Sequence, residues 1–98
     1  MKVKEYFETV IDAVSMQTDL RRGLILGSRT REAVDARWMV VRLMRDAGFY
    51  STQIAPLVGL SVRTVQIILI SFDNRMKYSA DSMLRNNYET ITKQLRSN

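Results

Sequence analysis

The chain has 98 residues, 46% of them hydrophobic, with a formal net charge of +5 and with neither cysteine nor histidine. This length and apolar content are those of one small globular domain, whereas the missing residue types exclude disulfides and thiolate metal sites and remove the commonest general base. Because no apolar run reaches the length of a membrane span and the charged N-terminus lacks a signal-peptide core, we expect a cytoplasmic protein outside the membrane.

The first predicted helix runs from Val3 to about Ser15. Apolar residues recur along it with the 3.6-residue period of an amphipathic helix, at Val3, Tyr6, Phe7, Val10, Ile11 and Val14. Three carboxylates fall on the opposite side, at Glu5, Glu8 and Asp12. We interpret them as a solvated outer face rather than as an acid–base pair.

A short second element is predicted after this helix. Thr18 or Asp19 is a suitable N-cap for it, and it is expected to end near Ile25. Gly23 and Gly27 bracket a predicted loop, which leads into the basic stretch Ser28-Arg29-Thr30-Arg31.

The longest predicted helix runs from Arg31 to Ala47. Gly48 is expected to end it, because glycine is the usual residue in the left-handed position after a helix. Phe49 and Tyr50 are predicted to cover the core at that end. One side of the helix carries Val34, Trp38, Met39, Val41, Leu43, Met44 and Arg45.

The segment from Ser51 to Ile70 has the pattern of a helix-turn-helix, and the whole motif is predicted to span about 51–76. Gly59 stands at the turn, where a positive φ is most easily adopted by glycine. Ser51 and Ser61 stand where each helix needs an N-cap oxygen, and Pro56 predicts a bend or an early end of the first helix. Ala55 is small where the two helices meet, and the apolar positions are Ile54, Val58, Leu60, Val65 and Ile68.

A last helix is predicted over about 81–96. Its inner face is formed by Met83, Leu84, Tyr88, Ile91 and Leu95. The chain is therefore predicted to be a single all-α domain, residues 1–98, with five to six helices in a compact cluster that contains a helix-turn-helix.

The basic residues are concentrated in one stretch of the chain. Seven arginines lie between Arg21 and Arg45, against only Glu32 and Asp35. Beside a helix-turn-helix, such a stretch favours a nucleic-acid partner. The alternative is an ordinary solvated surface.

The second helix of the motif would carry the contacts to DNA. Arg63 has the chemistry to read guanine and Gln66 to read adenine, while Thr64 and the helix N-terminal amides suit phosphates. The alternative is that these are ordinary surface residues. Ile67 and Ile70 are unusual on a DNA-reading helix, and we expect them either to pack under the C-terminal helix or to form a contact with a protein partner or a second copy.

Three features taken together resemble the C-terminal, origin-binding domain of the bacterial replication initiator DnaA. They are the basic loop at Ser28–Arg31, the run Asp35-Ala36-Arg37-Trp38, and the helix-turn-helix at a short interval after it. The resemblance covers roughly residues 10–77 and implies a Trp-repressor-like fold. It also implies that Arg29 enters the minor groove, that Arg31 and Arg37 are neighbouring basic contacts, and that Thr64 and Val65 match a threonine and a valine of the family signature.

The chain departs from that family inside the reading motif. Ser61 and Val62 stand where the family has aspartate and histidine, and Arg63 replaces a serine. A different target sequence, or weak non-specific binding, is therefore expected. The candidate DNA-binding residues are Arg29, Arg31, Arg37, Ser61, Val62, Arg63, Thr64 and Gln66.

These observations predict a free-standing, non-enzymatic domain that binds double-stranded DNA in replication or transcription control, in a bacterium or a mobile element. No phosphate-binding loop motif is present, so ATP binding is not expected, and we expect neither a cofactor nor a metal. The alternative function is a protein-interaction module that retains the fold but not DNA binding. An enzyme is not expected, because no group of side chains has a recognisable catalytic spacing.

Overall fold

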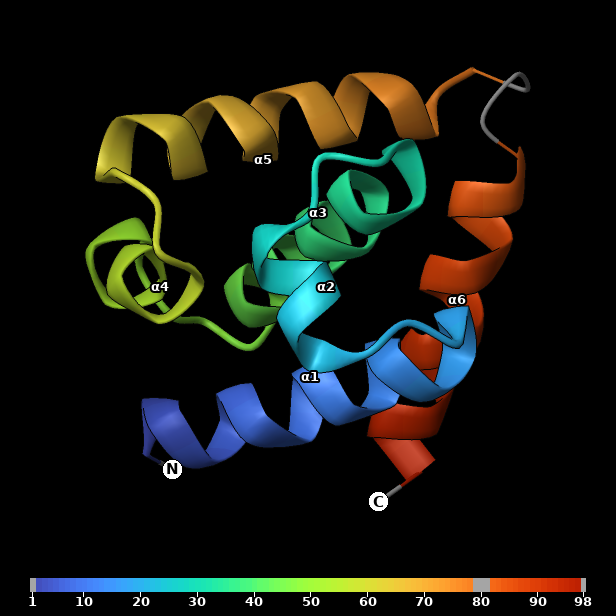
Figure 1. Cartoon of the computed structure of the whole chain (residues 1–98), viewed down its shortest axis with the longest axis horizontal. Coiled ribbons are helices and arrows are strands. Elements are labelled where there is room, and N and C mark those ends of the chain that lie inside the picture. Colours follow the sequence, from blue (N-terminus) through green and yellow to red (C-terminus); the bar gives the residue numbers. More distant parts are fainter. Residues whose placement is uncertain (1, 79–81, 98) are drawn as a thin grey trace.

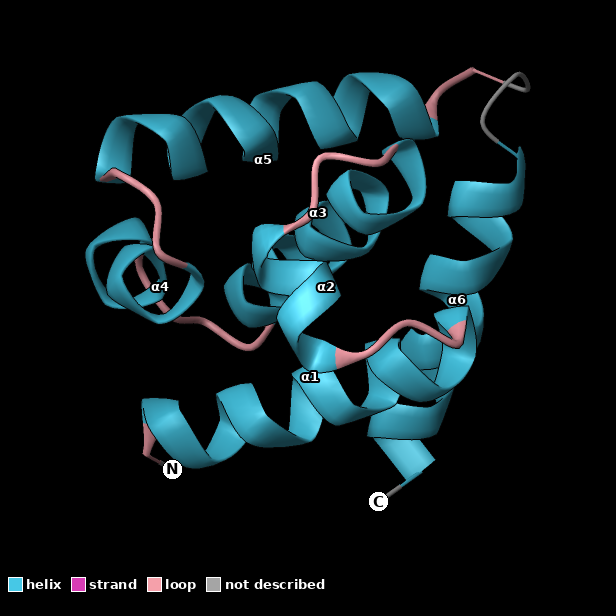
Figure 2. Ribbon diagram, in the orientation of Figure 1, coloured by secondary structure: helices cyan, strands magenta, loops and turns pink. Residues whose placement is uncertain are grey.

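The computed structural model describes residues 2–78 and 82–97, which form six α-helices and no strand (Figures 1 and 2). The helices are α1 (Val3–Thr18), α2 (Arg22–Gly27), α3 (Arg31–Asp46), α4 (Ser51–Val58), α5 (Val62–Met76) and α6 (Ser82–Ser97). The predicted all-α fold is confirmed.

Helix α3 lies at the centre and contacts each of the other five described helices. Helices α1 and α5 lie on opposite sides of it, and α6 packs against all three (Figure 1). A helix in this position must be apolar around most of its circumference. The buried residues of α3 meet this requirement: Ala33, Ala36, Met39, Val40, Val41, Leu43 and Met44.

Helix α1 is amphipathic as predicted, with Phe7, Val10, Ile11 and Val14 buried and the three carboxylates exposed. It continues to Thr18, however, three residues beyond the expected end. The Thr18 hydroxyl donates to the carbonyl of Val14 at 2.7 Å, within the helix. Asp19 ends the helix by adopting a left-handed φ of 58°.

The prediction for the next element was wrong in its bounds. Neither Thr18 nor Asp19 caps α2, whose N-cap is Arg21. Gly23 and Gly27 lie inside the helix rather than around a loop, because the carbonyl of Arg21 already accepts helical hydrogen bonds from Leu24 and Ile25.

Helix α3 begins with a side-chain cap and ends before a left-handed glycine. Thr30 accepts from the amide of Ala33 at 3.3 Å, and Gly48 has a φ of 98°, as predicted. The helix has 16 residues, the same as α1 and α6, so it is not the longest. Phe49 packs on the core beside Tyr6, with ring centroids 5.8 Å apart.

Tyr50 does not cover the core as predicted, since it is 65% exposed. It is instead the N-cap residue of α4, and the amide of Tyr50 donates to the side chain of Gln53 at 2.9 Å. Ser51 is therefore the first residue of the helix and not its cap. Helix α4 ends at Val58, two residues after Pro56, in agreement with the predicted early end.

Helix α6 presents Leu84 and Ile91 to the core, with Tyr88 and Leu95 partly buried against it. Met83 was predicted on this inner face but is 76% exposed. It lies in the first turn, at the rim of a groove between α6 and α3 rather than over the core. The expected start at Asp81 lies outside the described residues.

Candidate nucleic-acid interface

Helices α4 and α5 meet at a sharp angle across a short turn. Their axes are bent by 102°, and only Gly59, Leu60 and Ser61 separate them. Gly59 has a φ of 71°, the left-handed conformation expected of the turn glycine. The angle and the turn length both fall within the range of helix-turn-helix motifs.

The start of α5 is capped as predicted. The hydroxyl of Ser61 accepts from the amide of Thr64 at 3.1 Å and donates to the Thr64 hydroxyl at 2.9 Å. Val62 is 36% exposed beside this cap. The remaining free amides of the first turn, together with the helix dipole, form an electropositive end that suits an anion.

Two polar side chains stand on the outward face of the first two turns of α5. Arg63 and Gln66 are both exposed, and neither forms a hydrogen bond or an ion pair within residues 2–78 and 82–97. The opposite face of the helix is held in the core by Val65, Ile68 and Phe72. The core contacts therefore fix the helix with its Arg63 and Gln66 face toward solvent.

Two isoleucines continue this outward face. Ile67 is 50% exposed and Ile70 is 65% exposed. The alternative in which they pack under the C-terminal helix is therefore wrong, and α6 instead meets α5 at the buried Phe72, whose ring centroid lies 5.2 Å from that of Tyr88. Both side chains of this isoleucine pair therefore form part of the solvent-exposed surface of α5.

The loop between α2 and α3 displays Arg29. Within this loop, the Ser28 hydroxyl accepts from the amide of Thr30 at 3.3 Å, and Thr30 itself caps α3. Arg29 lies between these two residues and is exposed, with no polar partner in the described part of the chain.

Arg37 occupies a different position from the other candidate contacts. Its Nε donates to the carbonyl of Ile25 at 2.8 Å, and one of its terminal nitrogens donates to the carbonyl of Ser28 at 2.6 Å. The guanidinium therefore fastens the end of α2 and the basic loop to α3. Arg37 holds the loop that displays Arg29, and its own donors face protein carbonyls.

An ion pair joins the start of α3 to the end of α5. Arg75 donates to Asp35 at 2.9 Å, and the Arg75 guanidinium also lies 5.3 Å from the ring centroid of Trp38. Arg31, which is mostly exposed, approaches the same carboxylate at 3.9 Å. The basic loop therefore lies beside the C-terminal half of α5 (Figure 2).

Arg63 therefore lies at the N-terminal end of α5, whereas the basic loop lies next to its C-terminal half. Twelve residues separate Arg63 from Arg75, which corresponds to about 18 Å along a helix axis.

A second polar network ties α3, α5 and α6 together. Arg42 contacts Asp46 at 3.1 Å and Asp73 at 2.9 Å, and the Tyr88 hydroxyl donates to Asp46. Burial raises the pKa of the Tyr88 phenol, and the hydrogen bond to Asp46 raises it further. The i,i+4 spacing of Arg42 and Asp46 is visible in the sequence, but their partners on α5 and α6 are not.

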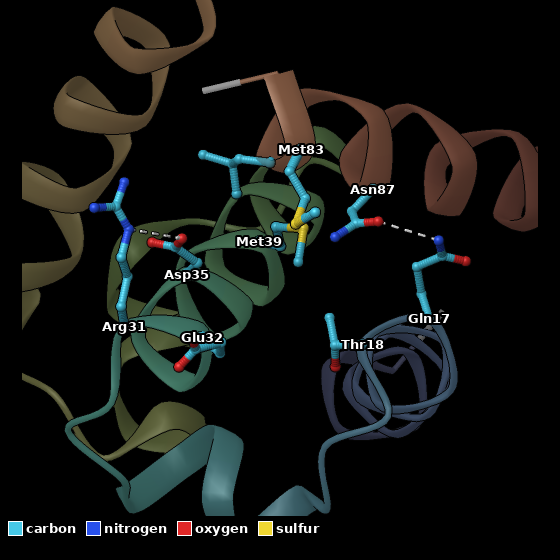
Figure 3. A pocket seen from close by; sticks show the side chains of 9 residues that line it. Gln17, Thr18, Arg31, Glu32, Asp35, Met39, Met83 and Asn87 are labelled. Carbon is cyan, nitrogen blue, oxygen red and sulfur yellow. Dashed lines mark hydrogen bonds and ion pairs between the residues drawn. The ribbon is translucent and has the colours of Figure 1, made fainter. Parts of the chain in front are cut away.

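A groove of about 530 Å³ lies between α1, α3 and α6 (Figure 3). Gln17 donates to Asn87 at 3.2 Å on one side of it, and the Arg31–Asp35 pair stands on the other. Met39 and Met83 lie between these polar groups (Figure 3). The groove is lined by side chains of both charges. None of the candidate DNA-binding residues at the start of α5 lines it.

Comparison of the chain with protein-family models, with curated proteins and with solved structures finds no match. The resemblance to the DnaA origin-binding domain and the Trp-repressor-like arrangement therefore stay predictions. Within the described ranges, no single helix has both the length and the apolar content to cross a bilayer; α4 and α5 together have both, but the pair is sharply bent.

Proposed function

We propose that this chain is a non-enzymatic protein that binds double-stranded DNA through α5 and the loop between α2 and α3. One observation carries the proposal. Arg63 and Gln66 are exposed and without polar partners in the described chain, on the first two turns of the second helix of a pair bent by 102°. In helix-turn-helix proteins, this part of the second helix meets base edges in the major groove.

The two side chains have complementary reading chemistry. A guanidinium donates two parallel hydrogen bonds to O6 and N7 of guanine, and a glutamine amide pairs with N6 and N7 of adenine. Thr64 and the free amides of the first turn would hold a phosphate beside them. Ser61 and Val62 flank this contact as the cap and the first residue of the helix.

The basic loop supplies the second contact. Arg29 is exposed on a loop fixed by Arg37, and Arg31 begins α3 beside it. Arg29 would enter the minor groove next to the major groove occupied by α5, and Arg31 would contact the backbone. We assign Arg37 the role of a positioning residue, because its donors are directed to the carbonyls of Ile25 and Ser28.

The resemblance of the basic loop and the α4–α5 segment to the DnaA origin-binding domain supports a role in replication or transcription control. Arg63 in place of the family's serine supports a target sequence different from the initiator's own box. The net charge of +5 supports a polyanion partner.

Charge reversal at the two ends of α5 tests this assignment. Arg63→Glu is expected to abolish the preference for one sequence over others, because it removes a base contact. Arg29→Glu is expected to weaken binding to all duplexes, because it removes a backbone or groove contact. Lys93→Glu, in the C-terminal half of α6 away from α5 (Figure 1), is the charge-matched control. Equal effects of Arg63→Glu and Lys93→Glu would refute the assignment.

A protein-interaction module is the second candidate, and the exposure of Ile67 and Ile70 favours it. An interface centred on these residues predicts an oligomer or a partner complex that Ile70→Asp disrupts without unfolding the domain. Sedimentation of the purified protein over a range of concentrations tests for an oligomer. A monomer at every concentration, with wild-type and variant sedimenting alike, would refute self-association through this face.

A further inference from the structure

Ile67 is an exposed apolar residue next to Arg63 and Gln66 on the outward face of α5. It lies four residues after Arg63, so the two side chains share one face of the helix about 6 Å apart along the axis. Gln66 stands beside it. Ile67 is not part of the buried core. Half of its side chain is exposed, whereas the nearby residues Val65 and Ile68 are buried.

Polar side chains border the exposed apolar surface around Ile67. A stable protein–protein interface buries about 800 Å² on each partner, whereas here only Ile70 extends the apolar surface along α5 before Asp73 and Asn74. Arg63 and Gln66 border it on the other side. The occupant that fits is a small apolar group next to hydrogen-bonding groups.

We propose that Ile67 contacts the C5-methyl group of a thymine in the major groove, about two base pairs from the base read by Arg63. The inference rests on the proposed DNA binding and specifies its target. The thymine C5-methyl is the only methyl group that an unmodified base pair presents in the major groove. An axial separation of about 6 Å corresponds to roughly two base-pair steps of 3.4 Å.

Ile70 provides an internal control for this assignment. It is exposed on the same face, one turn further along α5. Because base contacts come from the N-terminal part of a recognition helix, Ile70 is expected to lie beyond the groove floor. Ile67→Ala and Ile70→Ala therefore remove similar exposed groups from the same helix with different expected results.

The experiment begins with selection of bound sequences from a pool of random 20-base-pair duplexes, with the whole chain, for wild-type, Ile67→Ala and Ile70→Ala. Wild-type and Ile70→Ala are expected to enrich a site with a thymine at a fixed position near a guanine. Ile67→Ala is expected to keep the guanine and to lose the thymine. Thermal unfolding of each variant confirms that all three are folded.

The enriched duplex is then compared with one in which deoxyuridine, which lacks only the methyl group, replaces that thymine. Wild-type is expected to bind the deoxyuridine duplex three- to fivefold more weakly, the value of about one buried methyl group. Ile67→Ala is expected to bind both duplexes equally, and Ile70→Ala is expected to retain the difference.

Three results would overturn the proposal: no fixed thymine in the wild-type site, no effect of deoxyuridine, or an unchanged thymine preference in Ile67→Ala. If duplexes are bound in a salt-sensitive way in any of these cases, the proposed DNA binding stands and only the role of Ile67 is refuted. If no duplex is retained at low salt, both are refuted.

Discussion

Asp35 and Arg75 lie forty positions apart in the chain and form an ion pair of 2.9 Å between α3 and α5. Both side chains are about three-quarters buried, and the Arg75 guanidinium also covers Trp38. The pair fixes the end of α5 against the start of α3. It therefore sets the relation between the two surfaces that we propose to contact DNA.

Removal of this pair is expected to destabilise the fold. Asp35→Asn removes the carboxylate that accepts from the partly buried Arg75 guanidinium, and should lower the free energy of unfolding by about 1–2 kcal/mol. Urea unfolding followed by circular dichroism measures it. The control is Glu8→Gln, which removes the exposed ion pair between Glu8 and Arg22 and should change stability by less than about 0.5 kcal/mol. Equal effects would contradict the structural role of the Asp35–Arg75 pair.

Substitutions of Arg37 and Arg29 are expected to have different effects, the first on stability and the second on DNA binding. Arg37→Met leaves the carbonyls of Ile25 and Ser28 without their donors and should cost about 1–3 kcal/mol of stability. Arg29→Ala should leave stability within about 0.5 kcal/mol of wild-type, while lowering the slope of log affinity against log salt by about 0.9. Unfolding curves and salt titrations of both variants separate the two roles. A stable Arg37→Met protein with a reduced slope would make Arg37 a DNA contact.

Two glycine substitutions are expected to have opposite signs. Gly59 has a φ of 71° with open space around it, so Gly59→Ala meets only backbone strain and should cost about 1–2 kcal/mol. Gly23 lies inside α2, also with open space, and Gly23→Ala should stabilise the protein by about 0.4–1 kcal/mol. Thermal unfolding tests both. Stabilisation by Gly59→Ala would contradict the left-handed turn between α4 and α5.

Stability is expected to fall in alkaline solution. Burial and the hydrogen bond to Asp46 raise the pKa of Tyr88 above its usual value, so the folded protein keeps a proton that the unfolded chain has lost. The contribution of Tyr88 to stability is complete below a pH of about 10. It is lost as the pH rises from there through the pKa of the folded state. Burial also raises the pKa of Tyr6, so part of the effect has a second source.

Tyr88→Phe is therefore expected to flatten the decline in stability above pH 10, measured by urea unfolding at intervals between pH 8 and pH 11. Tyr50→Phe, which changes an exposed tyrosine, is the matched control and should retain the wild-type decline. An identical decline in Tyr88→Phe and wild-type would contradict the proposed linkage.

The local features of the fold were predictable from the sequence, because each depends on residues close together in the chain. The buried stripe of α1, the left-handed Gly48 and the capping of α5 by Ser61 are all of this kind. The cap of α4 was not predictable in the same way. Ser51 has the side chain of a usual N-cap, but the N-cap residue is Tyr50, whose amide donates to the side chain of Gln53.

The features that the sequence did not predict depend on distant parts of the chain. The resemblance made Arg37 a candidate DNA contact, whereas its hydrogen bonds to the carbonyls of Ile25 and Ser28 depend on where α2 and the basic loop lie. Ile70 has the same hydrophobicity whether it is buried or exposed, so its exposure of 65% depends on how the other helices pack around α5. The contact of Asp35 with Arg75 has no local signal at all.

DNA binding is tested most directly by fluorescence anisotropy of the purified protein on labelled random duplexes and on a duplex with the initiator box, at several salt concentrations. Contacts from Arg29, Arg31, Arg63 and the start of α5 predict binding to the random pool at low salt that weakens steeply as salt increases, by about 0.9 in log–log slope for each phosphate neutralised. They also predict no preference for the initiator box. Absence of binding at low salt would contradict the account and favour the protein-interaction surface at Ile67 and Ile70.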